Sequence, residues 1–419
     1  MCDGMHISQN LVFRSSDGSL VGFAKLDEVD RELERLEVLA YLVKGMASDV
    51  KCVIASFPFK IFTKEMMYKR TWDVIRHLET AGIKILALIC DGHPINRAFM
   101  MMHTPFTTGT TFSCIFDTIN FCAPEKRLLF FISDVCHLLK TIRNAFFNSG
   151  EGPKKPRLLT INGEIITWKT IVRLYFQYKN NNFRKSYKLN AQNVFPDSYS
   201  RMKVRYAAQP MSNTVAQDIE DQKWPGTEET VRFIRLIDRF FDCLNGAHTS
   251  MANRKNKPDL APYTVDNIDY EVKEGRFKFL RDFIAYLADW KKQVYRLPLS
   301  AEEKEKRILP IQTLIGIETS IRAIEAATVY FLDPQKGGGK FVNARIFSQD
   351  PLEQHFSKQR GRGGGSRNPN VAQFQQGQVV TALQRGLGVR KRKGNSTEED
   401  VSVEVVSEPL PKKARYSKK

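Results

Sequence analysis

The amino-acid sequence predicts an α/β protein whose core is interrupted by a large, mainly helical insertion. Three observations lead to this prediction. Residues 1–148 alternate buried-strand runs with amphipathic helices, residues 149–335 carry helical periodicity, and an acidic helix start with a basic, glycine-rich continuation comes only afterwards, at 336–376. Alternating strands and helices are typical of sheets covered by helices. The last segment, 377–419, is poor in aromatic residues and ends in mixed charge, which predicts a disordered tail.

The elements of the first segment follow from their apolar patterns. VKCVIASFPF (50–59) is a buried-strand run, and EMMYKRTWDVIRHLETAG (65–82) is an amphipathic helix that ends at a glycine. IKILALICDG (83–92) and RLLFFISD (127–134) are further strands, each with an aspartate at its carboxyl end. A helix follows over 135–148. This order predicts a parallel or mixed sheet with helices packed on it.

Asp91 and Asp134 stand where such sheets collect functional groups, at the carboxyl ends of strands. An aspartate there also serves as a helix cap or turn former. Asp134 directly precedes the helix predicted from Val135, so capping and catalysis are both open for it.

Long amphipathic helices make up most of the second segment. Apolar residues recur at three- and four-residue spacing in the runs at 167–181, 230–247, 275–296 and 310–333. A block of this length is too large for a loop and predicts a helical domain. It contains no Walker-type GxxxxGK[ST] run, and the glycines of KGGGK (336–340) lack the required spacing, so a P-loop is excluded.

The charge balance favours a polyanionic partner. Lys and Arg number 64 against 46 Asp and Glu, a net charge of +18 over 419 residues. DNA or RNA is the usual partner of such a chain, although a basic membrane-associated protein has a similar balance. No apolar run approaches the ~20 residues that span a bilayer, and MCDGMHISQN resembles no signal peptide. VRKRKGN and PLPKKARYSKK in the tail predict nuclear localisation or a nonspecific phosphate-binding tail.

The cysteines and histidines predict no structural metal site. The seven cysteines form no CxxC pair, and the seven histidines form no HExxH pattern. We expect reduced thiols and no structural zinc.

The segment IFSQDPLEQHFSKQRGRGGGSRNPN (346–370) combines acids and bases in a way that suggests nucleic-acid chemistry. Asp350 and Glu353 are three residues apart, which places both on one face of a helix. A glycine-rich stretch suited to a phosphate backbone follows, with the candidate DNA-binding residues Lys358, Arg360, Arg362 and Arg367. The alternative is a helix end that runs into a solvated loop.

A second basic surface is predicted on the helix that starts at 135. His137, Lys140 and Arg143 follow one another at helical spacing on one face, which could lie along a DNA backbone. The alternative is an ordinary amphipathic helix with a solvated basic side.

Two-metal phosphoryl transfer requires three acidic side chains that hold two divalent ions roughly 4 Å apart. The candidates are Asp3 at the chain start, Asp91 at a strand end and Glu353 after the helical block, with Asp134 as a fourth. Each is an ordinary residue on its own.

CDGMHISQNLVF, ALICDGHPINRAFM, SDVCHLLKTIRNAFFNSG and the segment at 346–370, in this order, resemble the P element transposases and their THAP-domain-linked relatives. The match runs from Asp3 to about Gln376. The resemblance implies an RNase H-like catalytic core whose last helix is separated from the rest by a GTP-binding helical insertion. It further implies Mg²⁺-dependent DNA cleavage and strand transfer in the nucleus, with DNA, GTP and further copies of the chain as partners and no membrane.

The resemblance also implies roles for individual residues. Asp3, Asp91 and Glu353 would be the catalytic acids that hold two Mg²⁺ ions, and Asp134 a neighbouring structural or DNA-facing acid. GTP would be bound without hydrolysis by residues that resemble the family's nucleotide contacts, namely Lys188, Lys203, Val204, Ser212, Asp242, Asn245 and Asp350. Lysines neutralise phosphates, and Asp and Asn match the hydrogen-bonding edge of guanine.

The chain departs from the family in two respects. The zinc finger and coiled coil that precede the family's core have no counterpart in these 419 residues, and CDGM stands where Asp-Glu-Met is usual. A truncated or domesticated, non-catalytic DNA- or chromatin-binding protein is therefore the alternative function.

Overall fold

A computed structural model describes most of the chain. The described residues are 1–8, 12–14, 19–21, 36–152, 155–179, 185–246, 248–268, 275–362 and 368–386. Met1–Gln378 form one compact unit, and Val379–Lys419 are separate from it. Within the described ranges, no helix is both long enough and apolar enough to cross a membrane.

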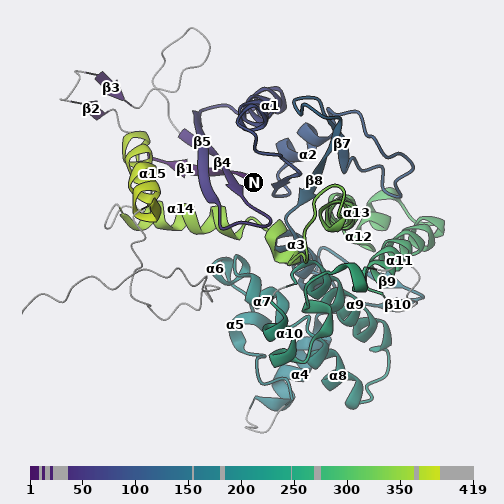
Figure 1. The fold of residues 1–419 in the computed structure, drawn as a ribbon. Coiled ribbons are helices and arrows are strands. Elements are labelled where there is room, and N and C mark those ends of the chain that lie inside the picture. Colours follow the sequence, from purple (N-terminus) through teal and green to yellow (C-terminus); the bar gives the residue numbers. More distant parts are fainter. Residues whose placement is uncertain are drawn as a thin grey trace, which may run out of the picture. The chain divides into compact units, whose positions relative to one another are not determined.

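The first sheet is antiparallel and has the order β1-β4-β5 (Figure 1). Its strands are β1 (Cys2–Ile7), β4 (Leu36–Lys44) and β5 (Lys51–Phe59). Residues 38–42 of β4 are all buried, and they alternate between two hydrophobic cores, with Val38 on one side and Leu39 on the other. A strand with apolar side chains on both faces needs helices on both faces of its sheet.

The second sheet is mixed, which confirms the sequence prediction. β6 (Ala87–Cys90) pairs in parallel with β8 (Arg127–Ser133), and β7 (Asp117–Asn120) pairs with β8 in the antiparallel direction. β1 contacts β6, so the two sheets meet at these strands. A separate hairpin is formed by β2 (Val12–Arg14) and β3 (Ser19–Val21).

Helices cover both faces of the sheets. α1 (Lys64–Thr80) and α2 (Pro94–Met100) share the core that contains Leu39, and α3 (Val135–Phe147) and α13 (Ile311–Leu332) share the core that contains Val38. The predicted end of α1 at a glycine is also confirmed, because Gly82 has a φ of +80° just beyond the helix.

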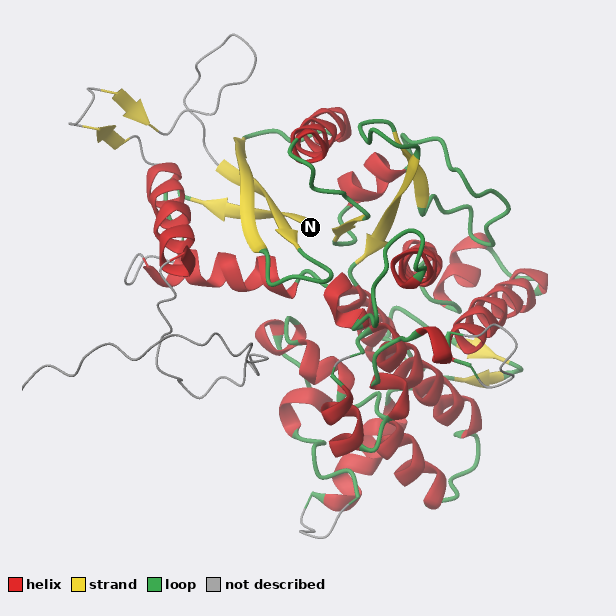
Figure 2. Ribbon diagram, in the orientation of Figure 1, coloured by secondary structure: helices red, strands yellow, loops and turns green. Residues whose placement is uncertain are grey.

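The predicted long helices of the second segment are present, and shorter elements connect them (Figure 2). In order they are β9 (Thr160–Ile161), β10 (Glu164–Ile165), α4 (Lys169–Tyr178), α5 (Ala191–Val194), α6 (Ser198–Arg201), α7 (Val204–Ala208), α8 (Asn213–Asp221), α9 (Glu228–Leu244), α10 (Thr249–Lys255), η1 (Pro258–Leu260), η2 (Val265–Asn267), α11 (Arg276–Arg296) and α12 (Ala301–Lys306). Aromatic pairs hold α9 against α11, with ring centroids 5.3 Å apart for Phe240 and Phe283.

The helix that ends this segment, α13, lies directly on the second sheet. Ser320 Oγ donates a hydrogen bond of 2.6 Å to the carbonyl of Ser133, the last residue of β8. A Cβ added at Gly316 would come within 2.8 Å of the Leu138 side chain, so the small residue permits close packing against α3. The predicted domain boundaries at 148, 335 and 376 remain predictions.

The chain then returns to the first sheet through η3 (Ala344–Phe347), α14 (Asp350–Arg362) and α15 (Val371–Gly386). The acidic helix predicted at Asp350 is confirmed, and it contacts β1. α15 includes residues 377–386, at the start of the predicted tail. The rest of the predicted tail lies outside the described residues.

Candidate active site

Three predicted carboxylates lie on elements that neighbour one another, namely β1, the end of β6 and α14. Asp3 lies on β1, Asp91 directly follows β6, and Glu353 lies in the first turn of α14. Burial, followed by the negative charge of Asp91 and a smaller contribution from Glu353, raises the pKa of Asp3 to about 7. Asp91 and Glu353 are thus near enough to Asp3 for their charges to raise its pKa.

Asp91 is held by the start of α2. Its Oδ1 accepts hydrogen bonds from the backbone N–H of His93, at 2.9 Å, and from the side-chain amide of Asn96, at 2.6 Å. Both bonds end on the same oxygen. In the part of the chain that the structure describes, Oδ2 therefore accepts no hydrogen bond and is available for a ligand.

The carboxylate of Asp134 is hydrogen-bonded on both oxygens, to His137 and to Gln349. It is 1% exposed and caps α3, with Oδ2 accepting from the backbone N–H and from Nδ1 of His137, both at 2.8 Å. Its Oδ1 accepts from the backbone N–H of Gln349 at 2.9 Å. Burial opposes ionisation, but the hydrogen bonds and charge of His137 outweigh it, so the pKa of Asp134 is lowered. Of the alternatives open for Asp134, the structure shows the helix cap.

His137 lies between Asp134 and Glu353. Its Nδ1 is bonded to Asp134, and its Nε2 lies 3.6 Å from Glu353 Oε1. Burial lowers the pKa of His137, but the hydrogen bond and charge of Asp134 reverse the effect and give a net increase. The ring therefore faces the acids, which places it inside the site and away from an open basic surface.

Gln349 is a site residue that the sequence analysis did not single out. It is completely buried, and its Nε2 donates a hydrogen bond of 2.7 Å to the carbonyl of Cys2, next to Asp3. Together with the bond from its N–H to Asp134, this joins the start of α14 to β1 and to the start of α3. In the sequence, Gln349 is marked only by its position in the SQDPLE run, where only the acidic residues were considered as candidates.

The donor set fits a divalent cation. Carboxylate oxygens are the ligands that Mg²⁺ and Mn²⁺ prefer. Burial raises the pKa of Asp3 most, and a cation would relieve the repulsion by Asp91 that adds to this increase. Within the described ranges, no three His, Cys, Asp or Glu side chains already converge at metal-ligating distances. Asp3, Asp91 and Glu353 are the residues that would hold the ion.

The predicted DNA-binding residues differ in their surroundings. Lys140 is half-buried beside His137, and Lys358 and Arg360 are exposed on α14. Arg362 donates to the carbonyl of Gly377, and Arg367 lies outside the described residues.

The prediction of Arg143 as a DNA contact was wrong. Arg143 is completely buried, and its Nη2 donates a hydrogen bond of 2.9 Å to the carbonyl of Arg201. The physical reason is that α3 packs against α7, α9 and α13 as well as the sheet, so even its basic face is partly covered.

Two of the predicted nucleotide residues, Lys188 and Asp242, influence the same residue of α10. Burial lowers the pKa of Lys255, and the charges of Asp242 and Lys188 also act on it. Asp242 is buried, and its Oδ2 lies 2.6 Å from Nζ of Lys257, which also pairs with Asp238 at 2.9 Å. Burial and the charge of Asp238 raise the pKa of Asp242 to about 6, and Lys257 offsets part of this increase. Lys257 was not predicted.

A second group of predicted nucleotide residues occupies helix starts. Lys203 precedes α7, its Nζ lies 4.0 Å from the ring centroid of Tyr199, and Val204 is the first residue of that helix. Ser212 precedes α8, and its hydroxyl donates to the carbonyl of Gln209 at 2.9 Å. No hydrogen bond or ion pair between described residues joins this group to Asp242 or Asp350.

The remaining pair, Asn245 and Asp350, is connected through Arg345. Asn245 ends α9, and the carbonyl of its neighbour Gly246 accepts a hydrogen bond of 3.0 Å from the backbone N–H of Arg345. Arg345 Nη2 lies 3.2 Å from Asp350 Oδ2. Lys44 lies close enough for both charges to affect its pKa, which burial lowers. Asp350 therefore links the end of α9 to the helix that carries Glu353.

Three family models match the chain in order. Residues 1–103 match the TNP-like RNase H N-terminal domain, residues 136–258 the TNP-like GTP-binding insertion domain, and residues 346–377 the TNP-like RNase H C-terminal domain. The predicted fold class, an RNase H-like core interrupted by a GTP-binding insertion domain, is thereby confirmed.

Named relatives and a solved structure agree with these matches. The chain is 24% identical over 308 residues to the Transposable element P transposase of Drosophila melanogaster, covering 72% of this chain and 36% of that protein. It is 25% identical over 295 residues to DNA transposase THAP9 of Homo sapiens, covering 66% of this chain and 30% of that one. The chain thus spans about a third of the length of these curated relatives.

The fold also resembles that in the Drosophila P element transposase strand transfer complex. The TM-score is 0.69 at 20% identity, over 92% of this chain and 76% of that one. Since all three TNP-like domains occur here in order and the fold matches as well, the chain belongs to the P element-like transposase family.

Proposed function

We propose that this chain is the catalytic core of a P element-type DNA transposase, which cuts DNA strands and transfers them to a target in a Mg²⁺-dependent reaction. The observation that supports this most directly is the meeting of Asp3, Asp91 and Glu353 from three separate elements. Glu353 reaches the other two from beyond the insertion, so the site forms only when the whole unit folds.

The residues of the proposed site have two roles: some would hold the metal ions, and others position these ligands. Asp3, Asp91 and Glu353 would hold two Mg²⁺ ions, which supply activation of the attacking oxygen and stabilisation of the leaving oxygen in this class of reaction. Asp134 and His137 orient Glu353 from one side. Gln349 fixes the start of α14 against β1, which sets the distance between Glu353 and Asp3.

GTP is the proposed cofactor, bound without hydrolysis at the insertion. Asp242 and Asn245 would recognise the guanine edge, with Lys188 and Lys203 on the phosphates and Val204 and Ser212 beside them. Lys257 pairs with Asp242 Oδ2 at 2.6 Å in the structure. Arg345 and Asp350 connect this region to α14, so GTP would favour the position of Glu353 that the reaction needs.

The proposed macromolecular partners are transposon-end and target DNA, and further copies of this chain. Lys140 beside the acids and the exposed Lys358 and Arg360 supply positive charge for the phosphate backbone. A nuclear location follows from a genomic DNA substrate.

A cleavage assay tests the proposal. The chain is incubated with transposon-end duplex, GTP and Mg²⁺, and compared with Asp91→Asn and Glu353→Gln. Glu302→Gln is the matched control, because the Glu302 side chain is 79% exposed on α12. Cleavage that both site variants lose and the control retains supports the transposase. DNA binding without cleavage in every form would instead support the domesticated, non-catalytic protein.

A further inference from the structure

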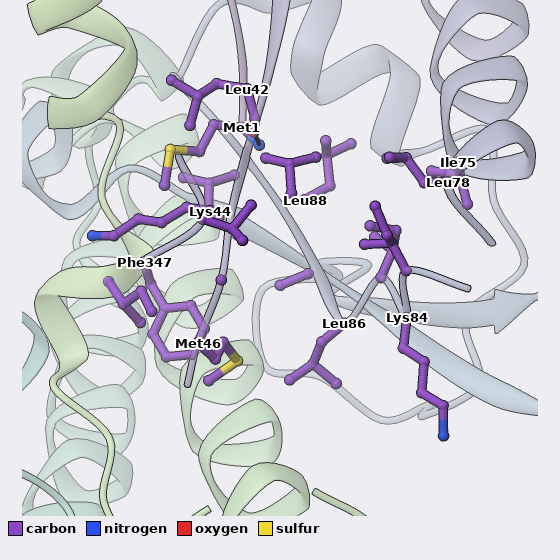
Figure 3. A pocket seen from close by; sticks show the side chains of 18 of the residues that line it. Met1, Leu42, Lys44, Met46, Ile75, Leu78, Lys84, Leu86, Leu88 and Phe347 are labelled. Atoms are coloured by element: carbon purple, nitrogen blue, oxygen red, sulfur yellow. Dashed lines mark hydrogen bonds between the residues drawn. The ribbon is translucent and has the colours of Figure 1, made fainter. Parts of the chain in front are cut away.

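The cations that best suit a polyanion lie on the insertion, beside α3, and not in the cavity between β4 and β6. This cavity, of about 570 Å³, has mainly apolar walls, and its lysines Lys44 and Lys84 extend away from each other (Figure 3). On the insertion, by contrast, Arg201, Lys203 and Arg205 occupy every second position from the end of α6 into α7.

These three cations have no acidic partner in the part of the chain that the structure describes. The side-chain hydrogen bonds of Arg201 and Arg205 end on neutral groups, a backbone carbonyl and a tyrosine hydroxyl. The neighbouring acid, Asp197, caps α6 by accepting from the backbone N–H of Ser200 at 2.6 Å. Ser200 is also the main cause of the lowered pKa of Asp197, to which Lys203 contributes less.

A further cation is buried directly behind Arg201. Arg143 is completely buried, and its Nη2 donates to the carbonyl of Arg201 at 2.9 Å. Its Nη1 is buried without a hydrogen-bond partner among the described residues. Burial, followed by the positive charge of Arg201, lowers the pKa of Arg143 to about 10. An anion bound at Arg201 would offset this repulsion, so the arrangement favours a negatively charged ligand.

An exposed aromatic ring lies among these cations. Tyr199 is 68% exposed on α6, and Nζ of Lys203 lies 4.0 Å from its ring centroid. Met202, three residues further on, is 71% exposed. The guanidinium of Arg201 lies 5.1 Å from the ring centroid of Phe147. Proteins bind unpaired nucleic acid with such a combination, because a base stacks on the ring while a cation binds the phosphate.

This part of α6 is connected to the proposed active site through α3. Near the start of α3, His137 lies 3.6 Å from Glu353, and further along the same helix Arg143 bonds to Arg201. Positions 137 and 143 are separated by about 9 Å along a helix axis. Lys140 stands between them and is half-buried. A DNA strand that leaves the acids can therefore follow α3 to α6.

We propose that Tyr199, Arg201 and Met202, together called the α6 surface, bind an unpaired DNA strand. A base stacks on Tyr199 beside the apolar side chain of Met202, and a phosphate of the same strand binds Arg201. A duplex fits less well, because its base faces are already stacked on one another. The inference rests on the proposed function, since strands separated from their complement are available where DNA is cut and transferred.

Binding without metal tests the α6 surface. The full chain is titrated in EDTA with a fluorescein-labelled thymidine strand of about 20 nucleotides and with a blunt duplex of the same length, and anisotropy gives both affinities. Tyr199→Ala is expected to weaken strand binding at least about fivefold and duplex binding less than about twofold. Tyr199→Phe keeps the ring and should bind as the parent does. Arg201→Met should reduce the slope of log K against log salt for the strand by about 0.7.

Tyr295→Ala and Arg296→Met are the matched controls. Tyr295 is 48% exposed on α11, with Nζ of Lys291 5.6 Å from its ring centroid, and Arg296 is exposed in the last turn of that helix. Both controls should bind the strand as the parent does. All replaced side chains are exposed, so every variant should unfold at the Tm of the parent.

Several outcomes would overturn the proposal. They are equal strand affinities of Tyr199→Ala and the parent, equal losses for strand and duplex, an equal loss in Tyr295→Ala, or no strand binding by the parent. A loss of GTP affinity in calorimetry with unchanged strand affinity would assign Tyr199 to the nucleotide site instead.

The same measurements separate the α6 surface from the proposed function, because they need neither Mg²⁺ nor cleavage. A chain that binds the strand through Tyr199 but cuts no DNA would keep the surface and lose the proposed catalysis. A chain that cuts DNA while Tyr199→Ala binds the strand like the parent would keep the function and lose the surface.

Discussion

Replacing Gln349 by leucine removes one side-chain amide at the centre of the site and keeps nearly the same volume. In the parent chain Nε2 of Gln349 donates to the carbonyl of Cys2 at 2.7 Å, and the side chain is completely buried. The backbone N–H of residue 349 continues to donate to Asp134 in the variant. The substitution therefore tests the connection between α14 and β1 without disturbing the cap of α3.

The expected cost comes from the carbonyl that loses its donor. A buried polar group left without a partner costs about 1–3 kcal/mol. Part of this cost is offset. Gln349 Oε1 is buried without a hydrogen-bond partner among the described residues, and the leucine variant no longer buries this oxygen. We therefore expect Gln349→Leu to lower the free energy of unfolding by about 1–2 kcal/mol.

Two measurements check the reasoning. Denaturant unfolding of the parent and the variant gives the free-energy difference at an unchanged m-value. Hydrogen exchange of residues 2–5 should accelerate, because β1 loses its tie to α14. Gln312→Leu is the control: Gln312 is exposed in the first turn of α13, and its replacement should stay within about 0.5 kcal/mol of the parent.

Equal unfolding midpoints for Gln349→Leu and the parent would refute the argument, since they would mean that the amide does not hold β1. The cleavage assay adds a second criterion. If Gln349 positions Glu353, the variant should lose kcat more than DNA affinity; the opposite pattern would assign the residue to DNA binding.

Three further predictions concern other parts of the unit. Lys140→Met should reduce the slope of log K against log salt for DNA binding by about 1, whereas the buried Arg143→Met should leave it unchanged; equal slopes in filter-binding titrations would contradict this. Asp242→Asn should weaken GTP binding at least tenfold in calorimetry, with Asp289→Asn, 68% exposed, unchanged; equal affinities would remove Asp242 from the site. Ser320→Ala should lower the free energy of unfolding by about 1–3 kcal/mol, because the last carbonyl of β8 loses its donor; an unchanged chemical-denaturation midpoint would contradict it.

Local sequence patterns predicted the long helices well, but they did not predict how buried individual residues are or which charged residues they pair with. The strands β5, β6 and β8, the helices α1 and α3, and the long helices of the second segment were recognised because side-chain periodicity is a local property. The strands β4 and β7 and the helix α2 were not recognised. The exposure of Arg143 was not, because the number of neighbours around α3 depends on the packing of α7, α9 and α13. Lys257 and Arg345 were not predicted for the same reason. Their roles depend on ion pairs with Asp242 and Asp350, which form only in the folded structure.

By itself, the sequence determined that acids stand at a strand end, at the chain start and at the first turn of a late helix, and that helices separate them. Only the tertiary structure decided which acids meet. The charges of Asp91 and Glu353 act on Asp3 because β6 and α14 both pack beside β1. Asp134 instead caps α3, and Asp350 pairs with Arg345. These roles depend on contacts across hundreds of residues, which no local pattern encodes.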